Sequence, residues 1–136
     1  MTTADLARLH AACFTVPRPW TEAEILSLSA PPYGVLLQDG AGFLIGRIVA
    51  AEAEVLTLAV DPATRRQGIG ARLVAEFLKL ARARGAIDVF LEVAADNLPA
   101  QALYQAAGFA ESGRRRGYYR QADGTPLDAI VMARRS

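Results

Sequence analysis

Two glycines, Gly68 and Gly70, stand where an apolar, strand-like stretch gives way to a helical pattern. A glycine lets the backbone approach a ligand closely because it has no Cβ atom. The first turn of a helix presents unpaired N–H groups and a partial positive charge. Together these features predict an anion site, most often for phosphate or pyrophosphate. Arg65 and Arg66 add positive charge beside it, so we expect the chain to hold a phosphate-bearing cofactor.

The elements that position this loop follow from hydrophobic spacing and turn signals. Thr21 and Glu24 form a capping box at a helix start, Asp39-Gly40 is a hairpin signal, and Gly85 ends the longest helix. We expect helices over 3–14, 21–30, 68–84 and 99–107, and strands over 33–38, 42–51, 54–60, 87–93, 109–114 and 128–134. This order predicts an α/β (α+β) fold in which helices cover both faces of a mixed sheet.

Composition narrows the function classes. The 136 residues fit one domain, 1–136, and the net charge of +1 gives no reason to expect nucleic-acid binding. The single cysteine, Cys13, excludes an internal disulfide and a cysteine-based metal site, and no metal is expected. No apolar run is long enough to span a membrane, and the N-terminus lacks a signal-peptide pattern. We therefore expect a cytoplasmic protein without membrane contact.

Four segments in order resemble the GNAT acetyltransferases. They are Leu58-Ala59-Val60-Asp61-Pro62, the loop Gln67-Gly68-Ile69-Gly70-Ala71 with Arg65 or Arg66 ahead of it, Leu91-Glu92-Val93-Ala94-Ala95-Asp96-Asn97, and Leu103-Tyr104-Gln105-Ala106-Ala107-Gly108-Phe109. The resemblance implies the GNAT fold, a twisted and mostly antiparallel sheet between helices, with acetyl-CoA as cofactor and coenzyme A as product. A P-loop nucleotide site is excluded, since the loop lacks the Gly-Lys-Ser/Thr ending.

Further segments are similar to the RimI-type branch, which acetylates the N-terminal alanine of a ribosomal protein. They are Glu92 with Tyr104 twelve residues later, Pro19-Trp20-Thr21-Glu22, Arg115-Arg116-Gly117-Tyr118-Tyr119 and Asp128-Ala129-Ile130-Val131-Met132. Two features depart from the branch. The chain begins almost at its first helix, where the family usually has a strand, which predicts an open sheet edge. Ala94 stands where arginine is common.

The resemblance implies a role for each site residue. Glu92 is the expected general base, through a water, and Tyr104 the expected acid for the coenzyme A thiolate. A backbone N–H on the 58–60 strand can polarise the acetyl carbonyl. The expected cofactor-binding residues are Leu58, Ala59, Val60, Arg65, Arg66, Gln67, Gly68, Ile69, Gly70, Ala71, Arg72, Asn97 and Tyr104; the expected substrate-binding residues are Glu92, Tyr118 and Tyr119.

Several of these residues have a structural alternative. Glu92 fits the solvated face of a strand, Tyr104 fits core packing, Asn97 fits a helix cap, Arg72 fits the surface, and the tyrosine pair fits packing. His10 and Cys13 are expected to be structural and far from every motif. Trp20 is expected to pack beside the Thr21 cap, with a place at the border of the peptide entrance as the alternative.

The acceptor is expected to be a primary amine. An α-amine has a pKa near 8 and a lysine one near 10.4, so neutralising lysine at pH 7 costs about 3 kcal/mol more. This favours the N-terminus of a protein as the acceptor, and a ribosomal protein is one candidate. The enzyme is expected to be a monomer or a weak dimer. A lysine side chain, a small-molecule amine and a non-catalytic acetyl-CoA-binding module are the alternatives.

Overall fold

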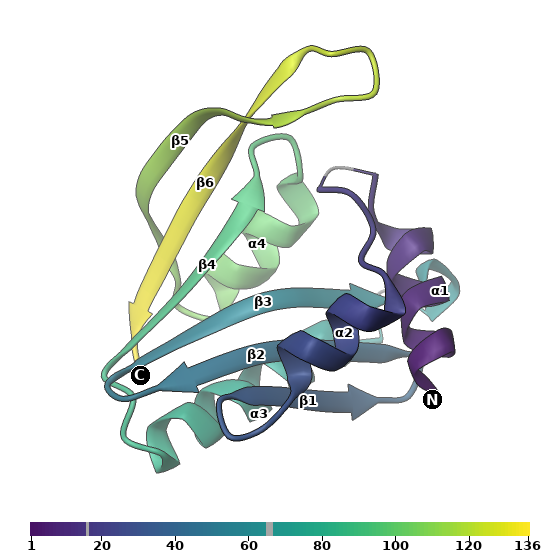
Figure 1. Cartoon of the computed structure of the whole chain (residues 1–136). Helices are drawn as coiled ribbons and strands as arrows, with labels where there is room; N and C mark the ends of the chain where they lie inside the picture. The colour runs from purple at the N-terminus through teal and green to yellow at the C-terminus, as the bar shows by residue number, and fades with distance from the viewer. Residues whose placement is uncertain (16, 65–66) are drawn as a thin grey trace.

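The computed structural model describes residues 1–15, 17–64 and 67–136, with four α-helices, one 3-10 turn and six strands in these ranges (Figure 1). The helical elements are α1 (Thr3–Cys13), α2 (Glu22–Ser29), η1 (Pro62–Thr64), α3 (Ile69–Ala83) and α4 (Leu98–Ala106). The strands are β1 (Gly34–Asp39), β2 (Gly42–Val49), β3 (Glu52–Val60), β4 (Asp88–Ala94), β5 (Ala110–Arg120) and β6 (Pro126–Arg135). The element order expected from the sequence is confirmed.

Side-chain caps fix the starts of the two N-terminal helices. Thr2 and Asp5 form a capping box at α1, and Thr21 and Glu24 form the expected one at α2. Each box satisfies backbone N–H groups that a helix start would otherwise leave unpaired. Asn97 caps α4 by accepting a hydrogen bond from the Ala100 amide at 3.2 Å. The capping role expected as the alternative for Asn97 is therefore present.

The six strands form one sheet in the order β1-β2-β3-β4-β6-β5. Within the described part of the chain, only the β3–β4 pair is parallel; the other neighbours are antiparallel. β1 is an edge strand, and among the described residues no strand precedes α1 or pairs with the outer side of β1. None of the helices in the described ranges is both long and apolar enough to cross a membrane.

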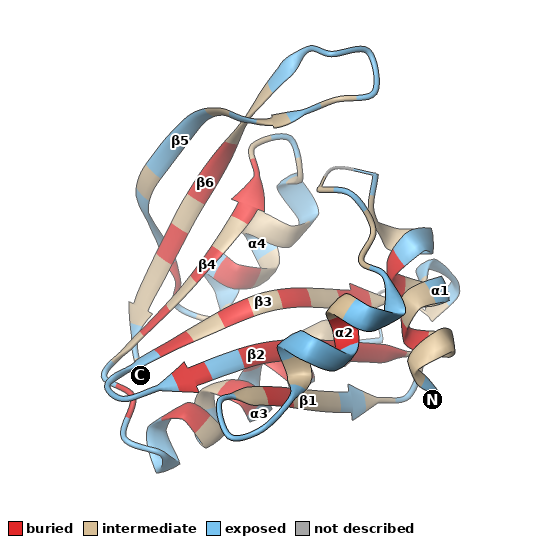
Figure 2. Cartoon of the chain, in the orientation of Figure 1, coloured by how far each residue is buried: buried red, intermediate tan, exposed pale blue. Residues whose placement is uncertain are grey.

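Two apolar clusters lie on opposite faces of the sheet. One gathers the inward stripe of α3 (including Leu73 and Phe77), Tyr104 of α4 and residues from most strands. The other joins Leu6 of α1 and Ile25 of α2 to β2 and β3. Figure 2 shows the buried residues alternating with less buried ones along β3 and β4. Helices therefore cover both faces, as the sequence predicts.

The two parallel strands separate along their length, and this separation makes room for a site. Residues 52–55 of β3 pair with residues 88–91 of β4, and among the described residues no pairing continues beyond Val55 and Leu91. β3 and β4 then diverge, with α4 following β4 (Figure 1). Backbone groups of residues 56–60 on the β4 side are thereby left without a strand partner, which is how a sheet can offer hydrogen bonds to a ligand.

A β-bulge adds to this irregularity. Thr57 pairs with Ile45 and Val55 pairs with Gly46, so Leu56 has no partner in β2. The extra residue shifts the alternation of the strand. Leu56 packs in the cluster beside α1, and Thr57 also faces α1. Two consecutive side chains therefore point to one face just where β3 leaves β4.

Candidate active site

The larger of two adjoining cavities has a volume of about 920 Å³ and lies under the N-terminal end of α3. Its walls come from the end of β3, the glycine loop and the start of α4. Seven of the residues expected to hold the cofactor line it: Leu58, Val60, Gly68, Ile69, Gly70, Ala71 and Asn97. The structure thus brings the separate sequence segments together at one cavity.

The start of α3 is built to leave N–H groups available. Gly68 is the N-cap with φ +76°, a left-handed conformation that favours glycine, and it makes no side-chain cap. The first helical bond runs from the Arg72 amide to the Gly68 carbonyl at 3.0 Å. The amides of residues 69–71 precede that bond and have no acceptor within the helix. They therefore supply hydrogen-bond donors for an anion in the cavity.

Close packing also favours a glycine at position 70. A Cβ atom there would lie 3.3 Å from the Leu103 side chain and 3.7 Å from that of Leu58. The first turn of α3 can therefore pack against both α4 and β3, and this contact sets the shape of the cavity floor.

Other expected cofactor residues lie elsewhere. Arg72 is paired with Asp39 through two bonds of 2.8 and 3.2 Å and donates to the Gln67 carbonyl at 3.0 Å. It ties the loop to the β1–β2 hairpin, and the guanidinium lowers the pKa of the Asp39 carboxyl. Neither Arg72 nor Gln67 is among the described residues that line these two cavities. Ala59 is buried in the cluster beside α1, and Arg65 and Arg66 lie outside the described residues.

The smaller cavity, of about 180 Å³, lies between the diverging parts of β3 and β4. Glu92, Tyr104 and Tyr119 all line it. Leu58 and Asn97 line both cavities, so the two adjoin. A molecule bound along the larger cavity can therefore present one end to the side chains of the smaller cavity, which we call the acceptor cavity.

Glu92 lies on β4 just beyond the last residue paired with β3. Its side chain is 29% exposed and accepts a hydrogen bond from Arg115 Nη1 at 2.7 Å. The same guanidinium lies 3.8 Å from the centre of the Tyr118 ring, a favourable cation–π distance. Tyr118 itself is 49% exposed and does not line either cavity. Of the tyrosine pair, only Tyr119 reaches the acceptor cavity.

An irregular stretch of β5 brings these side chains to the site. Between Arg115 and Tyr119 this strand contains two more residues than the matching part of β6. Asp128 stabilises the bulge by accepting bonds from the Gly117 amide at 2.8 Å and from Arg114 at 2.9 Å. Burial, followed by the Glu92 charge, raises the pKa of Tyr119 to about 12, so its phenol is protonated at neutral pH.

Tyr104 is 7% exposed and packs edge-on against Phe109. Burial raises its pKa above the ordinary value, because the phenolate is poorly solvated there. The phenol therefore keeps its proton and can donate a hydrogen bond into the acceptor cavity.

The expectation that His10 and Cys13 lie far from every motif is wrong. Cys13 lines the larger cavity, which we call the cofactor cavity, and its Sγ donates to the Val60 carbonyl at 3.3 Å. His10 lines the acceptor cavity and contacts Thr57. Thr57 was the available signal, since a polar side chain in an apolar strand needs a buried partner.

Glu54 is a further residue that the sequence did not single out. It lines the acceptor cavity, and burial raises its pKa, with repulsion from Glu92 acting in the same direction.

No group of three or more His, Cys, Asp or Glu in the described ranges could hold a metal ion.

Comparison with known proteins agrees with this geometry. Residues 3–109 match the acetyltransferase (GNAT) family. The chain is 40% identical over 119 residues to the ribosomal protein bS18-alanine N-acetyltransferase of Escherichia coli strain K12, covering 85% of this chain and 80% of that protein. It is 38% identical to the N-alpha-acetyltransferase RimI of Mycobacterium tuberculosis strain H37Rv, covering 100% and 90%.

A solved structure is similar over nearly the whole chain. It is the crystal structure of the ribosomal-protein-alanine N-acetyltransferase from Escherichia coli, with a TM-score of 0.86 and 33% identity, covering 98% of this chain and 86% of that one. The fold, the two adjoining cavities and these relatives lead to one conclusion. The chain belongs to the GNAT family and is an acetyl-CoA-dependent N-acetyltransferase.

Proposed function

We propose that this enzyme acetylates the α-amine of a protein N-terminus, with the N-terminal alanine of ribosomal protein bS18 as the leading acceptor. The observation that carries the proposal is the meeting of Glu92 and Tyr104 in one cavity that adjoins the cofactor cavity. Relatives that act on that alanine, at 40% identity, support the same acceptor.

The cofactor is proposed to lie along the larger cavity. The pyrophosphate would accept hydrogen bonds from the free amides at the start of α3. The pantetheine arm runs beside residues 58–60, where β3 has left β4. Asn97, which lines both cavities, would contact the arm where the two cavities adjoin. Arg72 acts indirectly, by fixing the loop through Gln67 and Asp39.

Direct transfer needs no covalent enzyme intermediate. The neutral amine nitrogen attacks the acetyl carbon, a backbone N–H of the diverging part of β3 stabilises the oxyanion, and the carbon–sulfur bond breaks. Glu92 accepts the proton of the amine through a water. The coenzyme A thiolate leaves and takes a hydrogen bond from Tyr104.

Tyr104 is better suited to donate that bond than to lose its proton. An ordinary phenol has a pKa of about 10 and a thiol about 8.5, so complete transfer is already uphill. Burial raises the pKa of Tyr104 further. Hydrogen bonding stabilises the leaving thiolate, which then takes its final proton from solvent.

A thiol-release assay tests the proposal. The wild-type protein and acetyl-CoA are combined with a peptide of the bS18 N-terminal sequence, the same peptide with a blocked N-terminus but a free lysine, and a small primary amine. We expect release with the free N-terminus and none when it is blocked. Robust turnover of the small amine with none of the N-terminal peptides led by Ala, Ser or Met would overturn the proposal.

The proposed function also has consequences for the oligomeric state and the cellular location of the enzyme. The enzyme is proposed to act as a monomer or weak dimer. A ribosomal-protein acceptor would place the enzyme in the cytoplasm. Sedimentation at assay concentrations tests the first point.

A further inference from the structure

Among the residues that the structure describes, His10 is the one buried titratable side chain near the acceptor cavity to which the proposed reaction gives no task. It is 1% exposed and lies on α1. Its ring is stacked between Phe14 and Trp20, with ring centres 4.4 and 5.1 Å away. Both ring nitrogens are also used: Nε2 lies 2.9 Å from Thr57 Oγ1, and Nδ1 accepts from the Trp20 amide at 3.1 Å.

These partners fix the tautomer. Since Nδ1 accepts the Trp20 N–H, it carries a lone pair, and in the neutral ring the proton must then be on Nε2. Nε2 therefore donates to the Thr57 hydroxyl. Burial also lowers the pKa of His10, to about 4, which keeps the ring neutral and this arrangement intact at pH 7.

The imidazole thus joins three parts of the protein. Thr57 lies on β3 next to the bulged Leu56, His10 lies on α1, and Trp20 comes directly before the capping box of α2. Phe14, Pro17 and Trp20 line the acceptor cavity opposite Glu92 of β4, and we call these three residues the acceptor wall. One side chain therefore ties the acceptor wall to the strand that holds the cofactor.

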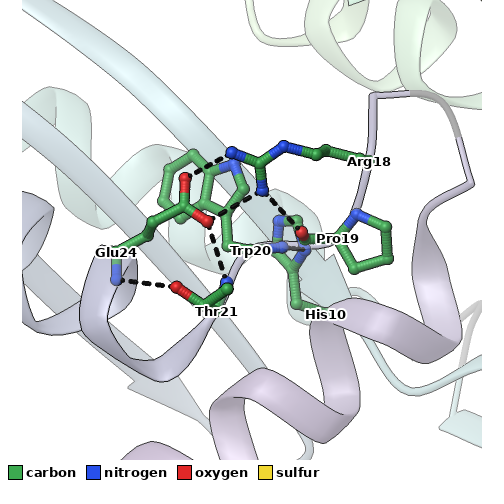
Figure 3. A network of polar contacts seen from close by, with 6 residues as sticks. All are labelled: His10, Arg18, Pro19, Trp20, Thr21 and Glu24. Atoms are coloured by element: carbon green, nitrogen blue, oxygen red, sulfur yellow. Dashed lines mark hydrogen bonds and ion pairs between the residues drawn. The ribbon is translucent and has the colours of Figure 1, made fainter.

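A second set of contacts fixes the outer side of the wall (Figure 3). Arg18 donates to both oxygens of Glu24 at 2.8 and 2.9 Å and to the Pro19 carbonyl at 3.1 Å. Figure 3 shows these residues around Trp20, with His10 beneath the indole and Thr21 beside Glu24. The outer contacts are exposed, whereas the bond from the Trp20 amide to His10 is partly buried, so this bond is the stronger constraint on the wall.

We propose that His10 is a positioning residue for acceptor recognition: it holds the acceptor wall at the distance from β3 that fits a peptide N-terminus. The inference rests on the proposed function, since it concerns the same acceptor. It gives His10 no contact with the reacting atoms. Its loss should weaken peptide binding more than acetyl-CoA binding, because Phe14 is the one member of the wall that also lines the larger cavity, where the glycine loop lies.

Two substitutions separate the two bonds of the ring. In His10→Asn the side-chain oxygen lies near the position of Nδ1 and can accept the Trp20 N–H. In His10→Gln the terminal amide reaches the position of Nε2 and leaves the Trp20 N–H without its acceptor. The measurements are hydrogen exchange of the Trp20 amide and the KM and kcat for peptide and acetyl-CoA.

For His10→Gln we expect Trp20 exchange and the peptide KM each to rise about five- to tenfold, the effect of one lost hydrogen bond. We expect little change in kcat or in the KM for acetyl-CoA. His10→Asn should restore the exchange rate and most of the peptide KM. Equal protection of the Trp20 amide in His10→Gln and the wild type, or equal loss in both variants, would overturn the inference.

The exchange measurement separates this inference from the proposed function. If the wild type acetylates no N-terminal peptide, the proposed function fails, while Trp20 exchange still decides whether His10 holds the wall. Should either His10 variant not fold, Thr57→Val and Thr57→Ser provide a second pair. Faster Trp20 exchange in Thr57→Val, with wild-type exchange in Thr57→Ser, supports the inference, and unchanged exchange in both opposes it.

Discussion

Arg115 and Glu92 form an ion pair at the end of the acceptor cavity, with Nη1 and Oε1 2.7 Å apart. The Tyr118 ring holds the guanidinium from its other side at 3.8 Å. Arg115 donates to Oε1 of the carboxylate, which leaves Oε2 for a water or for the incoming amine. The pair therefore orients the carboxylate without blocking it.

Arg115→Gln should lower kcat with peptide about fivefold and leave the KM for acetyl-CoA unchanged. A charge-assisted bond is strong when buried, but this one is partly exposed, so the expected loss is modest. Arg116→Gln is the matched control, since Arg116 is an exposed neighbour on the same strand. Equal kcat values in both variants would show that Arg115 does not orient Glu92.

Glu92→Gln should reduce kcat by about 10²- to 10³-fold, the range for loss of a general base. The amide keeps the size of the side chain but cannot accept the amine proton. The KM for acetyl-CoA should stay close to the wild-type value, because Glu92 lines the acceptor cavity and not the larger one. A kcat within a few-fold of wild type would remove Glu92 from this role.

Tyr104→Phe should reduce kcat about tenfold or more while the KM for acetyl-CoA stays close to wild type. The ring stays in place against Phe109, so the change removes only the hydrogen bond to sulfur. Because burial raises the pKa of Tyr104, the wild-type rate should show no loss from phenol ionisation up to pH 9. A raised acetyl-CoA KM with unchanged kcat would point to packing alone.

Gly68→Ala should raise the KM for acetyl-CoA several-fold and destabilise the fold by about 1 kcal/mol, because φ +76° is unfavourable for alanine. Gly85→Ala is the matched control. It has φ +88°, no atom within 4 Å of an added Cβ, and lies beyond the other end of α3. Both variants should lose similar stability by denaturant unfolding. A similar acetyl-CoA defect in both would mean that the effect is not local to the loop.

Much of the fold could be predicted because its signals are local. The Thr21–Glu24 capping box, the glycine after α3 and the alternation along β4 each act over a few residues. The cofactor cavity follows from the same signals, since the glycine loop comes directly after an apolar strand. The helix and strand order was therefore right, with boundaries shifted by a few residues; the largest change is β5, which runs on to Arg120.

The acceptor cavity depends on contacts between residues that are far apart in the sequence. The spacing of residues along the chain does not reveal these contacts. The bulge at Leu56 leaves an apolar run that looks regular in the sequence. The bond between His10 and Thr57 joins residues 47 positions apart. The sequence does not reveal that Arg72 pairs with Asp39 rather than with a phosphate, because this pairing depends on the β1–β2 hairpin lying beside α3.

The neutral, buried state of His10 also predicts how stability depends on pH. Burial lowers its pKa from 6.5 to about 4, with the Glu24 charge opposing part of the shift. Between these values the unfolded chain binds the proton and the folded protein does not, so the free energy of unfolding falls as pH falls. The loss should approach about 3 kcal/mol near pH 4.

His10→Asn removes the titrating group while keeping the acceptor for Trp20. Denaturant unfolding at pH 7 and pH 4.5 should therefore show a smaller loss in this variant than in the wild type. The Glu24 carboxyl, whose pKa Arg18 lowers to about 2, remains ionised across this interval, so it does not mimic the effect. Parallel losses in both proteins would mean that His10 can take up a proton without leaving its place between Thr57 and Trp20.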